Sequence, residues 1–226
     1  MSTVKKLHNI NMRSRTLLWL TLFAIAMAYV EAALVVHLRQ IYYAENLAAI
    51  FPLRLLTHHD LAIELAREVA TIVMIVTVAL LAVRDIGRRF AAFVFIFGVW
   101  DLFYYLWLKL LIDWPQTWLE WDVLFLIPWP WLGPWITPTM IALLFTIWGA
   151  WVLASKHKPR FTRLSGSVFL VGAILGLAAF LWPAALLLPD GEQAFDGYQP
   201  GHFPWLLYSV GFTAMTASLI ASLRTH

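Results

Sequence analysis

Residues 58–83 read HHDLAIELAREVATIVMIVTVALLAV, and this stretch decides the fold class. The part from Leu61 to Val83 is long enough to span a bilayer as a helix, which takes roughly 20 mostly apolar residues. Its beginning is unusually polar, because six of the first eleven residues can ionise: His58, His59, Asp60, Glu64, Arg67 and Glu68. The stretch predicts a transmembrane helix and leaves open whether its charged end is a solvated helix start or a site.

The composition of the whole chain agrees with a membrane protein. Of its 226 residues, 62% are hydrophobic and 13% are charged, whereas about 25% are charged in a soluble domain. Charge and proline return at the ends of six apolar runs, which we read as spans: Thr16–Leu38, Leu61–Val83, Phe90–Ile112, Pro138–Ser155, Ser167–Leu188 and Trp205–Leu223. The sequence therefore predicts an all-α, polytopic membrane protein with six transmembrane helices in a single membrane domain, residues 1–226.

Several classes of function are excluded or disfavoured at this stage. The chain has no cysteine, which excludes disulfides, thiolate metal sites and cysteine nucleophiles. Residues 1–15 form a basic tail, and the apolar run after it is too long for a signal peptide, so we expect a retained first helix. The net charge of +3 follows the membrane topology, and we expect the lipid bilayer and no nucleic acid as a partner. Protein partners are unknown.

The distribution of basic residues predicts the orientation. Lysines and arginines gather in the N-terminal tail, in the loops after the second and fourth spans, and at the C-terminus: Lys5, Lys6, Arg13, Arg15, Arg84, Arg88, Arg89, Lys156, Lys158, Arg160, Arg163 and Arg224. The other connections hold Asp113, Glu120, Asp122, Asp190, Glu192 and Asp196, with Arg39 and Arg54 as loop cations. This bias predicts that both termini lie inside, in a bacterial-type plasma membrane.

Residues 113–137 form an outer segment rich in tryptophan and proline, which begins DWPQTWLEWDVLFLIPWPWLGPW. Asp113 and Gln116 have the spacing of a capping box, which predicts a short helix from Trp114 to about Ile127. Four prolines break any helix beyond that point: Pro128, Pro130, Pro134 and Pro138. An apolar run this short is typical of an interfacial or re-entrant segment. It is read either as an aromatic belt at the membrane surface or as a lid over a pocket between helices.

Charged residues within the spans are confined to the first three: Glu31, Glu64, Arg67, Glu68, Asp101 and Lys109. Such residues are costly in a bilayer and often mark ion pathways. A rise of about 1.5 Å per residue places Glu31 and Glu68 about 6 Å inside the outer boundary, with Asp101 about 12 Å inside. Spans four to six (residues 138–226) hold no charged residue within their apolar runs and are expected to be scaffold. There, Gly172, Gly176 and Gly211 allow close helix packing.

Neighbouring helices would bring these acids together. We predict an acidic pocket that opens to the outside, with Arg67 as the internal counter-charge. Its candidate binding residues are Glu31, Glu64, Arg67, Glu68, Asp101, Tyr104 and Tyr105. One arginine cannot balance the acids, so some carboxyls must be protonated, bound to a cation or wet. The leading expectation is that the pocket binds a cation, protons or a small polar ligand, in transport or in ligand binding.

Other functions stay open, and so does the question whether the protein is an enzyme. A divalent-metal site would use carboxylates and imidazoles from Glu31, Glu68, Asp101, His37, His58 and His59, but the Glu-x-x-His spacing is absent. His58 and His59 alternatively lie in headgroup water. A haem between His37 and either His59 or His202 is less favoured. The runner-up is a metal-dependent or acid–base membrane enzyme with a hydrophobic substrate, and the third reading is a scaffold or assembly subunit.

Overall fold

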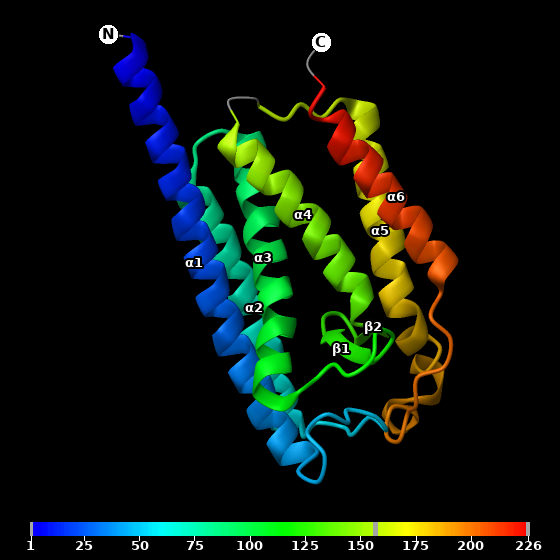
Figure 1. Ribbon diagram of the computed structural model, residues 1–226. Helices are drawn as coiled ribbons and strands as arrows, with labels where there is room; N and C mark the ends of the chain where they lie inside the picture. Colours follow the sequence, from blue (N-terminus) through cyan, green and yellow to red (C-terminus); the bar gives the residue numbers. More distant parts are fainter. Residues whose placement is uncertain (1, 156–157, 225–226) are drawn as a thin grey trace.

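The computed structural model describes residues 2–155 and 158–224, so Lys156, counted above among the basic residues, lies outside the described residues. The chain is mostly helical: α1 (Ser2–Tyr42), α2 (His58–Ala82), α3 (Ile86–Ile112), α4 (Ile136–Ala154), α5 (Arg163–Ala185) and α6 (Trp205–Ala221) (Figure 1). Within the described ranges, five helices are long and apolar enough to cross a membrane, and α6 is apolar but shorter. The predicted class of helical membrane protein is confirmed at this level.

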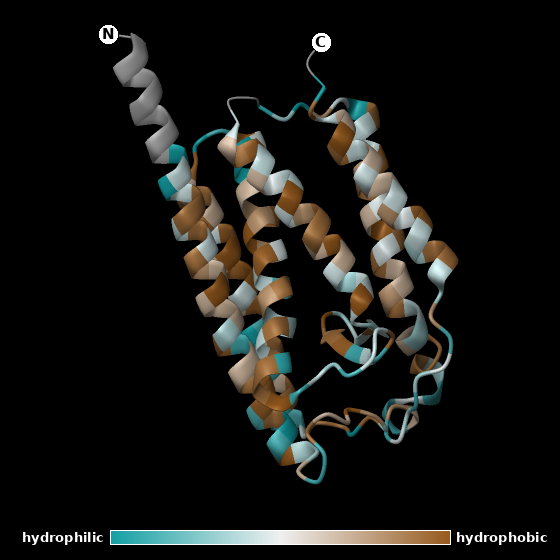
Figure 2. Cartoon of the chain, viewed as in Figure 1, coloured by the Kyte–Doolittle hydropathy of each residue, from teal (hydrophilic) through white to brown (hydrophobic). Residues whose placement is uncertain are grey.

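The α3 helix lies at the centre of the bundle, with α1 and α2 on one side and α4 on the other (Figure 1). Its contact with α4 is unusually close, because a Cβ atom on Gly98 would lie 2.4 Å from the carbonyl oxygen of Ala142. The core around it is apolar and includes Ile75, Ile96 and Trp148. Figure 2 shows hydrophobic residues along the middle of this group and hydrophilic residues near its lower end.

The helices α5 and α6 form a second packed unit (Figure 1). A Cβ on Gly172 would lie 2.8 Å from the carbonyl oxygen of Gly211, and a Cβ on Gly211 would lie 2.7 Å from that of Gly172. Neither position can accept a side chain without separating the two backbones. The predicted close packing through small residues is therefore confirmed for this pair of glycines.

The tryptophan- and proline-rich segment is an antiparallel hairpin of β1 (Trp121–Phe125) and β2 (Trp131–Pro134), so the predicted helix from Trp114 to Ile127 is wrong. The predicted capping box is not formed, because Asp113 is the left-handed C-cap of α3. The Glu120 carboxylate instead accepts hydrogen bonds from the backbone of Gln116 and Thr117, at 2.6 and 3.2 Å. Prolines on both sides of the segment favour extended backbone over a helix.

The first helix also ends later than predicted. It continues past Leu38 to Tyr42, so Arg39 belongs to α1 and is buried. The expectation that Arg39 is a loop cation is therefore wrong. The connection from α1 to α2 runs over residues 43–57 and ends at Thr57, whose hydroxyl caps α2 by accepting a hydrogen bond from the backbone of Asp60 at 3.1 Å. After α5, the chain forms two short 3-10 helices, η1 (Leu188–Asp190) and η2 (Glu192–Ala194), before α6.

Candidate functional site

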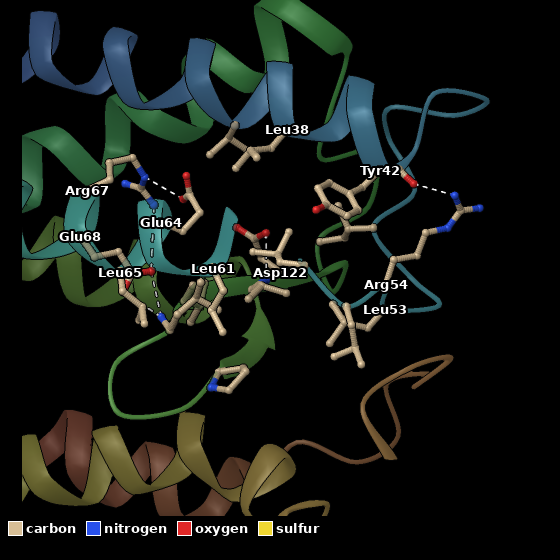
Figure 3. A pocket seen from close by; sticks show the side chains of 18 of the residues that line it. Leu38, Tyr42, Leu53, Arg54, Leu61, Glu64, Leu65, Arg67, Glu68 and Asp122 are labelled. Atoms are coloured by element: carbon tan, nitrogen blue, oxygen red, sulfur yellow. Dashed lines mark hydrogen bonds and ion pairs between the residues drawn. The ribbon is translucent and has the colours of Figure 1, made fainter. Parts of the chain in front are cut away.

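A cavity of about 430 Å³ lies where the ends of α1, α2 and α3 meet the 43–57 connection, the hairpin and the η1–η2 segment (Figure 3). This space, called the outer pocket below, has walls formed by all of the candidate binding residues: Glu31, Glu64, Arg67, Glu68, Asp101, Tyr104 and Tyr105. The hairpin contributes Leu124, Leu126 and Trp129 to the lining. The hairpin therefore forms part of the pocket wall.

The packing of α2 explains why its acids face inward. Its buried residues follow one stripe along the helix, with successive spacings of three or four: Glu64, Glu68, Thr71, Ile75 and Ala79. The later part of this stripe is apolar and packs into the core, whereas the part near the start of α2 is acidic. The same face that holds α2 against the bundle thus carries two carboxylates into the outer pocket.

Arg67 links two helices at the pocket wall. Its Nη1 atom donates to Glu31 Oε1 on α1, and its Nε atom donates to Glu64 Oε2 on α2 at 2.8 Å. The carboxylate of Glu68 lies 4.0 Å from Nη2. Glu31 also accepts a hydrogen bond from the Thr71 hydroxyl at 3.3 Å. Arg67 is thus engaged with Glu31 and Glu64, and the structure places no ion pair between it and Asp101 in the described part of the chain.

Glu68 ties α2 to the hairpin. Both of its carboxylate oxygens lie within hydrogen-bonding distance of the Leu126 backbone N–H, at 2.9 and 3.0 Å. Leu126 directly follows β1, where the chain turns toward β2. A single side chain therefore holds the turn of the hairpin against the first turns of α2.

Asp101 differs from the other acids of the pocket. Its Oδ2 atom is shielded from solvent and has no hydrogen-bond partner among the described residues, and the same is true of Nε1 of its neighbour Trp100. Both residues line the outer pocket, and Trp100 is only 5% exposed. Buried polar atoms are nearly always hydrogen-bonded. Asp101 and Trp100, both in the pocket wall, therefore carry a buried acceptor and a buried donor that the described residues leave unsatisfied.

Two pocket residues were not recognised as site candidates from the sequence. Asp122 on β1 lies 3.7 Å from Arg39 and accepts a hydrogen bond from Tyr105 at 3.1 Å. The Arg39 guanidinium also stacks over Trp114, 4.2 Å from the ring centroid. Burial raises the pKa of Asp122 to about 6, although Arg39 opposes this shift. The available signal was an acid within an apolar run, since Asp122 interrupts the sequence Trp121–Phe125.

The rim of the pocket is held by Tyr42. Its hydroxyl donates to Asp60 Oδ2 at 2.5 Å and accepts a hydrogen bond from the Thr57 backbone at 3.1 Å. Arg54 donates to the Tyr42 carbonyl oxygen at 2.7 Å (Figure 3). These contacts fix the 43–57 connection over the end of α2.

The candidate metal ligands do not gather into one site. Within the described ranges, no three histidine, aspartate or glutamate side chains are placed to hold a metal ion. His37 and His59 are exposed and contact Gln40 and Asp60, and His58 is an exposed residue at the rim of the pocket. His202, considered for haem, is also exposed. Lys109 contacts Asp113 at 2.6 Å, and its side chain is 47% exposed.

Carboxylates outnumber guanidinium groups in the lining of the outer pocket. Six acids stand against three arginines: Glu31, Glu64, Glu68, Asp101, Asp122 and Glu192 against Arg39, Arg54 and Arg67. The acids of the lining thus exceed its arginines by three. Comparison with known proteins finds no matching family model, no matching curated protein and no matching solved structure. The function must therefore be inferred from this geometry.

Proposed function

We propose that the chain crosses a plasma membrane six times, with both termini inside and the outer pocket facing outward. Five helices have the required length, and we assign the sixth crossing to α6, which is apolar but shorter. The basic residues near α1, between α2 and α3 and between α4 and α5 support this orientation under the positive-inside rule. Glu31, Glu64, Glu68 and Asp101 would then lie in the outer half of the bilayer.

The outer pocket, in this proposal, binds a ligand with a positive charge, either an ammonium group or a proton. The observation that carries the proposal is the unsatisfied Oδ2 atom of Asp101 in a pocket with an excess of carboxyl groups. A buried carboxylate needs a hydrogen bond and a counter-charge, and an ammonium group supplies both. The arginines are engaged elsewhere, because Arg67 binds Glu31 and Glu64 while Arg39 contacts Asp122.

Acid–base catalysis on a hydrophobic substrate is the second candidate. One feature favours catalysis. Asp101, the hydroxyl-bearing Tyr104 and many leucines line the same pocket. Acid–base catalysis needs a proton acceptor and a proton donor within reach of the same substrate. The ligand-binding proposal needs only the charge and the unsatisfied oxygen, and it therefore comes first.

Calorimetric titration of the purified protein with butylammonium tests the proposal. We expect saturable binding to the wild type and at least tenfold weaker binding to Asp101→Asn, because hydrogen bonds to charged groups contribute about 1.5–3 kcal/mol. Asp113→Asn is the matched control, since Asp113 is an exposed aspartate outside the pocket, and it should bind like the wild type. Equal binding by the wild type and Asp101→Asn, or equal binding of uncharged butanol, would contradict the proposal.

A further inference from the structure

We propose that the ligand is an amphiphile, with a cationic nitrogen on a hydrocarbon chain that enters the outer pocket sideways between α2 and the η1 segment. This inference rests on the proposed function and adds the chemical class of the ligand and its route of entry. Three observations carry it. They are the mixture of acids and leucines in the pocket lining, the few helical neighbours of α2, and the partners that the arginines already have.

The pocket lining combines charged groups with many leucines. The charged side chains of α1, α2 and α3 include Glu31, Glu64 and Asp101. The apolar lining comes from the 43–57 connection, the start of α2, the hairpin and η1, and its leucines are Leu53, Leu55, Leu56, Leu61, Leu65, Leu124, Leu126 and Leu188. Figure 3 shows Leu61 and Leu65 beside the charged residues of α2. A single ligand that contacts both the acids and the leucines needs a charged group and an apolar chain.

The helix α2 has few helical neighbours beside the pocket. Within the described part of the chain, α2 packs on α3 and to a smaller extent on α1, and it makes no extensive contact with α4, α5 or α6. Two leucines of the pocket lining are partly exposed, with 36% for Leu61 on α2 and 44% for Leu188 in η1. In the proposed orientation, Leu61 lies near the outer boundary of the bilayer, about 10 Å above Glu68, so the hydrocarbon chain would enter between α2 and η1 at the level of the lipid head groups.

The charge of the head group follows from the partners that the pocket's arginines already bind. Arg67 binds two carboxylates, Arg39 contacts Asp122 and the Leu47 carbonyl oxygen, and Arg54 binds the Tyr42 carbonyl oxygen. An anionic head would have to displace these partners and would meet an excess of acids. A cation instead finds the unsatisfied Oδ2 atom of Asp101.

The size of the pocket agrees with such a ligand. Its volume of about 430 Å³ lies within the roughly 300–1,000 Å³ that is typical of small-molecule sites. The head group and the first part of the chain would fill the pocket, and the remainder would extend between α2 and η1. Unsatisfied Nε1 of Trp100 gives a further contact for a hydroxyl or ester oxygen near the head.

A chain-length series tests the inference on the purified protein. Ethyl-, butyl- and octylammonium are titrated below their micelle-forming concentrations and corrected for partitioning into the detergent. We expect the dissociation constant to fall by roughly fourfold for each methylene group that enters the pocket. Octanol and octanesulfonate should bind at least tenfold more weakly than octylammonium.

The results separate this inference from the proposed function. Butylammonium and octylammonium binding with equal affinity would overturn the amphiphile while leaving cation binding intact. Absence of binding for the whole series would overturn both. Octanesulfonate binding as tightly as octylammonium would overturn the charge assignment.

Two variants test the route of the chain. Leu61→Gln, at a half-exposed position of the pocket mouth, should weaken octylammonium at least fivefold and leave ethylammonium unchanged. Ile63→Gln lies on the same turn of α2, is 50% exposed and does not line the pocket, so it should change neither. Equal losses for the two variants, or a loss for both ligands in Leu61→Gln, would overturn the sideways entry.

Competition identifies the source of the ligand, which is either a membrane lipid with an ammonium head or a free amphiphile. Displacement of octylammonium by dihexanoylphosphatidylethanolamine supports a lipid, and failure to displace supports a free amphiphile. Equal displacement by dihexanoylphosphatidylglycerol, which lacks the ammonium group, would overturn the inference.

Discussion

Arg67 shows how a single residue can hold a site together. It reaches across from α2 to Glu31 on α1 while also binding Glu64, so two carboxylates share one guanidinium in a partly shielded wall. Breaking a buried ion pair on one side leaves an uncompensated charge, which is costlier than the intact pair is stabilising. Arg67 therefore has a structural role in the pocket, whereas Oδ2 of Asp101 has no hydrogen-bond partner among the described residues.

Replacing Arg67 with Gln should lower the free energy of unfolding by about 3 kcal/mol, because Glu31 and Glu64 lose their counter-charge. Chemical denaturation in detergent measures the change. Lys109→Gln is the control, since it removes an exposed pair with Asp113 and should cost at most about 1 kcal/mol. Equal costs for the two variants would show that the wall is fully solvated. The double variant Arg67→Gln with Glu31→Gln should recover part of the loss.

Asp122 should make the stability depend on pH. Its pKa is about 6 in the folded protein, raised from 3.8 mainly by burial, so the folded state holds the proton more tightly than the unfolded state. The Asp122 carboxyl therefore adds roughly 3 kcal/mol to the free energy of unfolding. This contribution is fully present below about pH 4 and is lost as the pH rises through 6. Arg39, Tyr105, Asp101 and Glu120 are the groups that act on it.

The measurement is the melting temperature between pH 4 and pH 7. Asp122→Asn cannot titrate, and its melting temperature should fall less than that of the wild type over this range. Glu45→Gln changes an exposed acid of the 43–57 connection and should keep the wild-type slope. An unchanged slope in Asp122→Asn would mean that this carboxyl is already ionised at pH 4 in the folded state.

At the scale of elements, the hairpin and α2 depend on each other. The turn after β1 is held by two contacts from Glu68. This part of the pocket wall is therefore fixed to α2, the helix that carries two of the pocket's acids. The sequence cue for a capping box pointed to a helix here, because such cues are local. The prolines and the contacts of Glu68 and Asp122 with distant elements decided in favour of extended strands.

Removing the Glu68 carboxylate should loosen the hairpin. We expect amide hydrogen exchange at Leu126 to be about 10- to 100-fold faster in Glu68→Ala, because a hydrogen bond to a charged group contributes about 1.5–3 kcal/mol. Exchange measured by mass spectrometry resolves this segment. Glu120→Ala removes a carboxylate that caps Gln116 and Thr117 at the other end of the hairpin, and it should leave Leu126 unchanged. Protection of Leu126 in Glu68→Ala would show that the strands alone hold the turn.

The closeness of α3 and α4 can be tested at Gly98. Gly98→Ala should destabilise the protein by about 1–3 kcal/mol, since the new methyl group meets the backbone of Ala142. Gly166→Ala is the control in α5, where the added Cβ meets no other part of the described chain within 4 Å, and it should be neutral or slightly stabilising. Denaturation in one detergent measures the free energy of unfolding of both variants. A neutral Gly98→Ala would mean that α3 and α4 can move apart freely.

At the scale of the whole molecule, the chain divides into a charged part and an apolar part. Residues of α1, α2, α3 and the hairpin build the outer pocket, while α5 and α6 pack through glycines. Glu31, Glu64, Glu68 and Asp101 could be singled out from the sequence because acids stand out in apolar helices. Asp122 offers the same cue within its apolar run, but its place in the pocket depends on the path of the hairpin, and the burial of Arg39 depends on where α1 ends.

Directional labelling of a pocket cysteine tests the central claim most directly. The chain has no native cysteine, so Leu65→Cys places one thiol in the pocket lining while keeping every acid. An impermeant cationic thiol reagent should modify it from the outside faster than an anionic reagent of the same size, and butylammonium should slow the reaction. At Ile63→Cys, butylammonium should have no effect. Modification of Leu65→Cys only from the inside, or at a rate that butylammonium leaves unchanged, would contradict an outward-facing cation pocket.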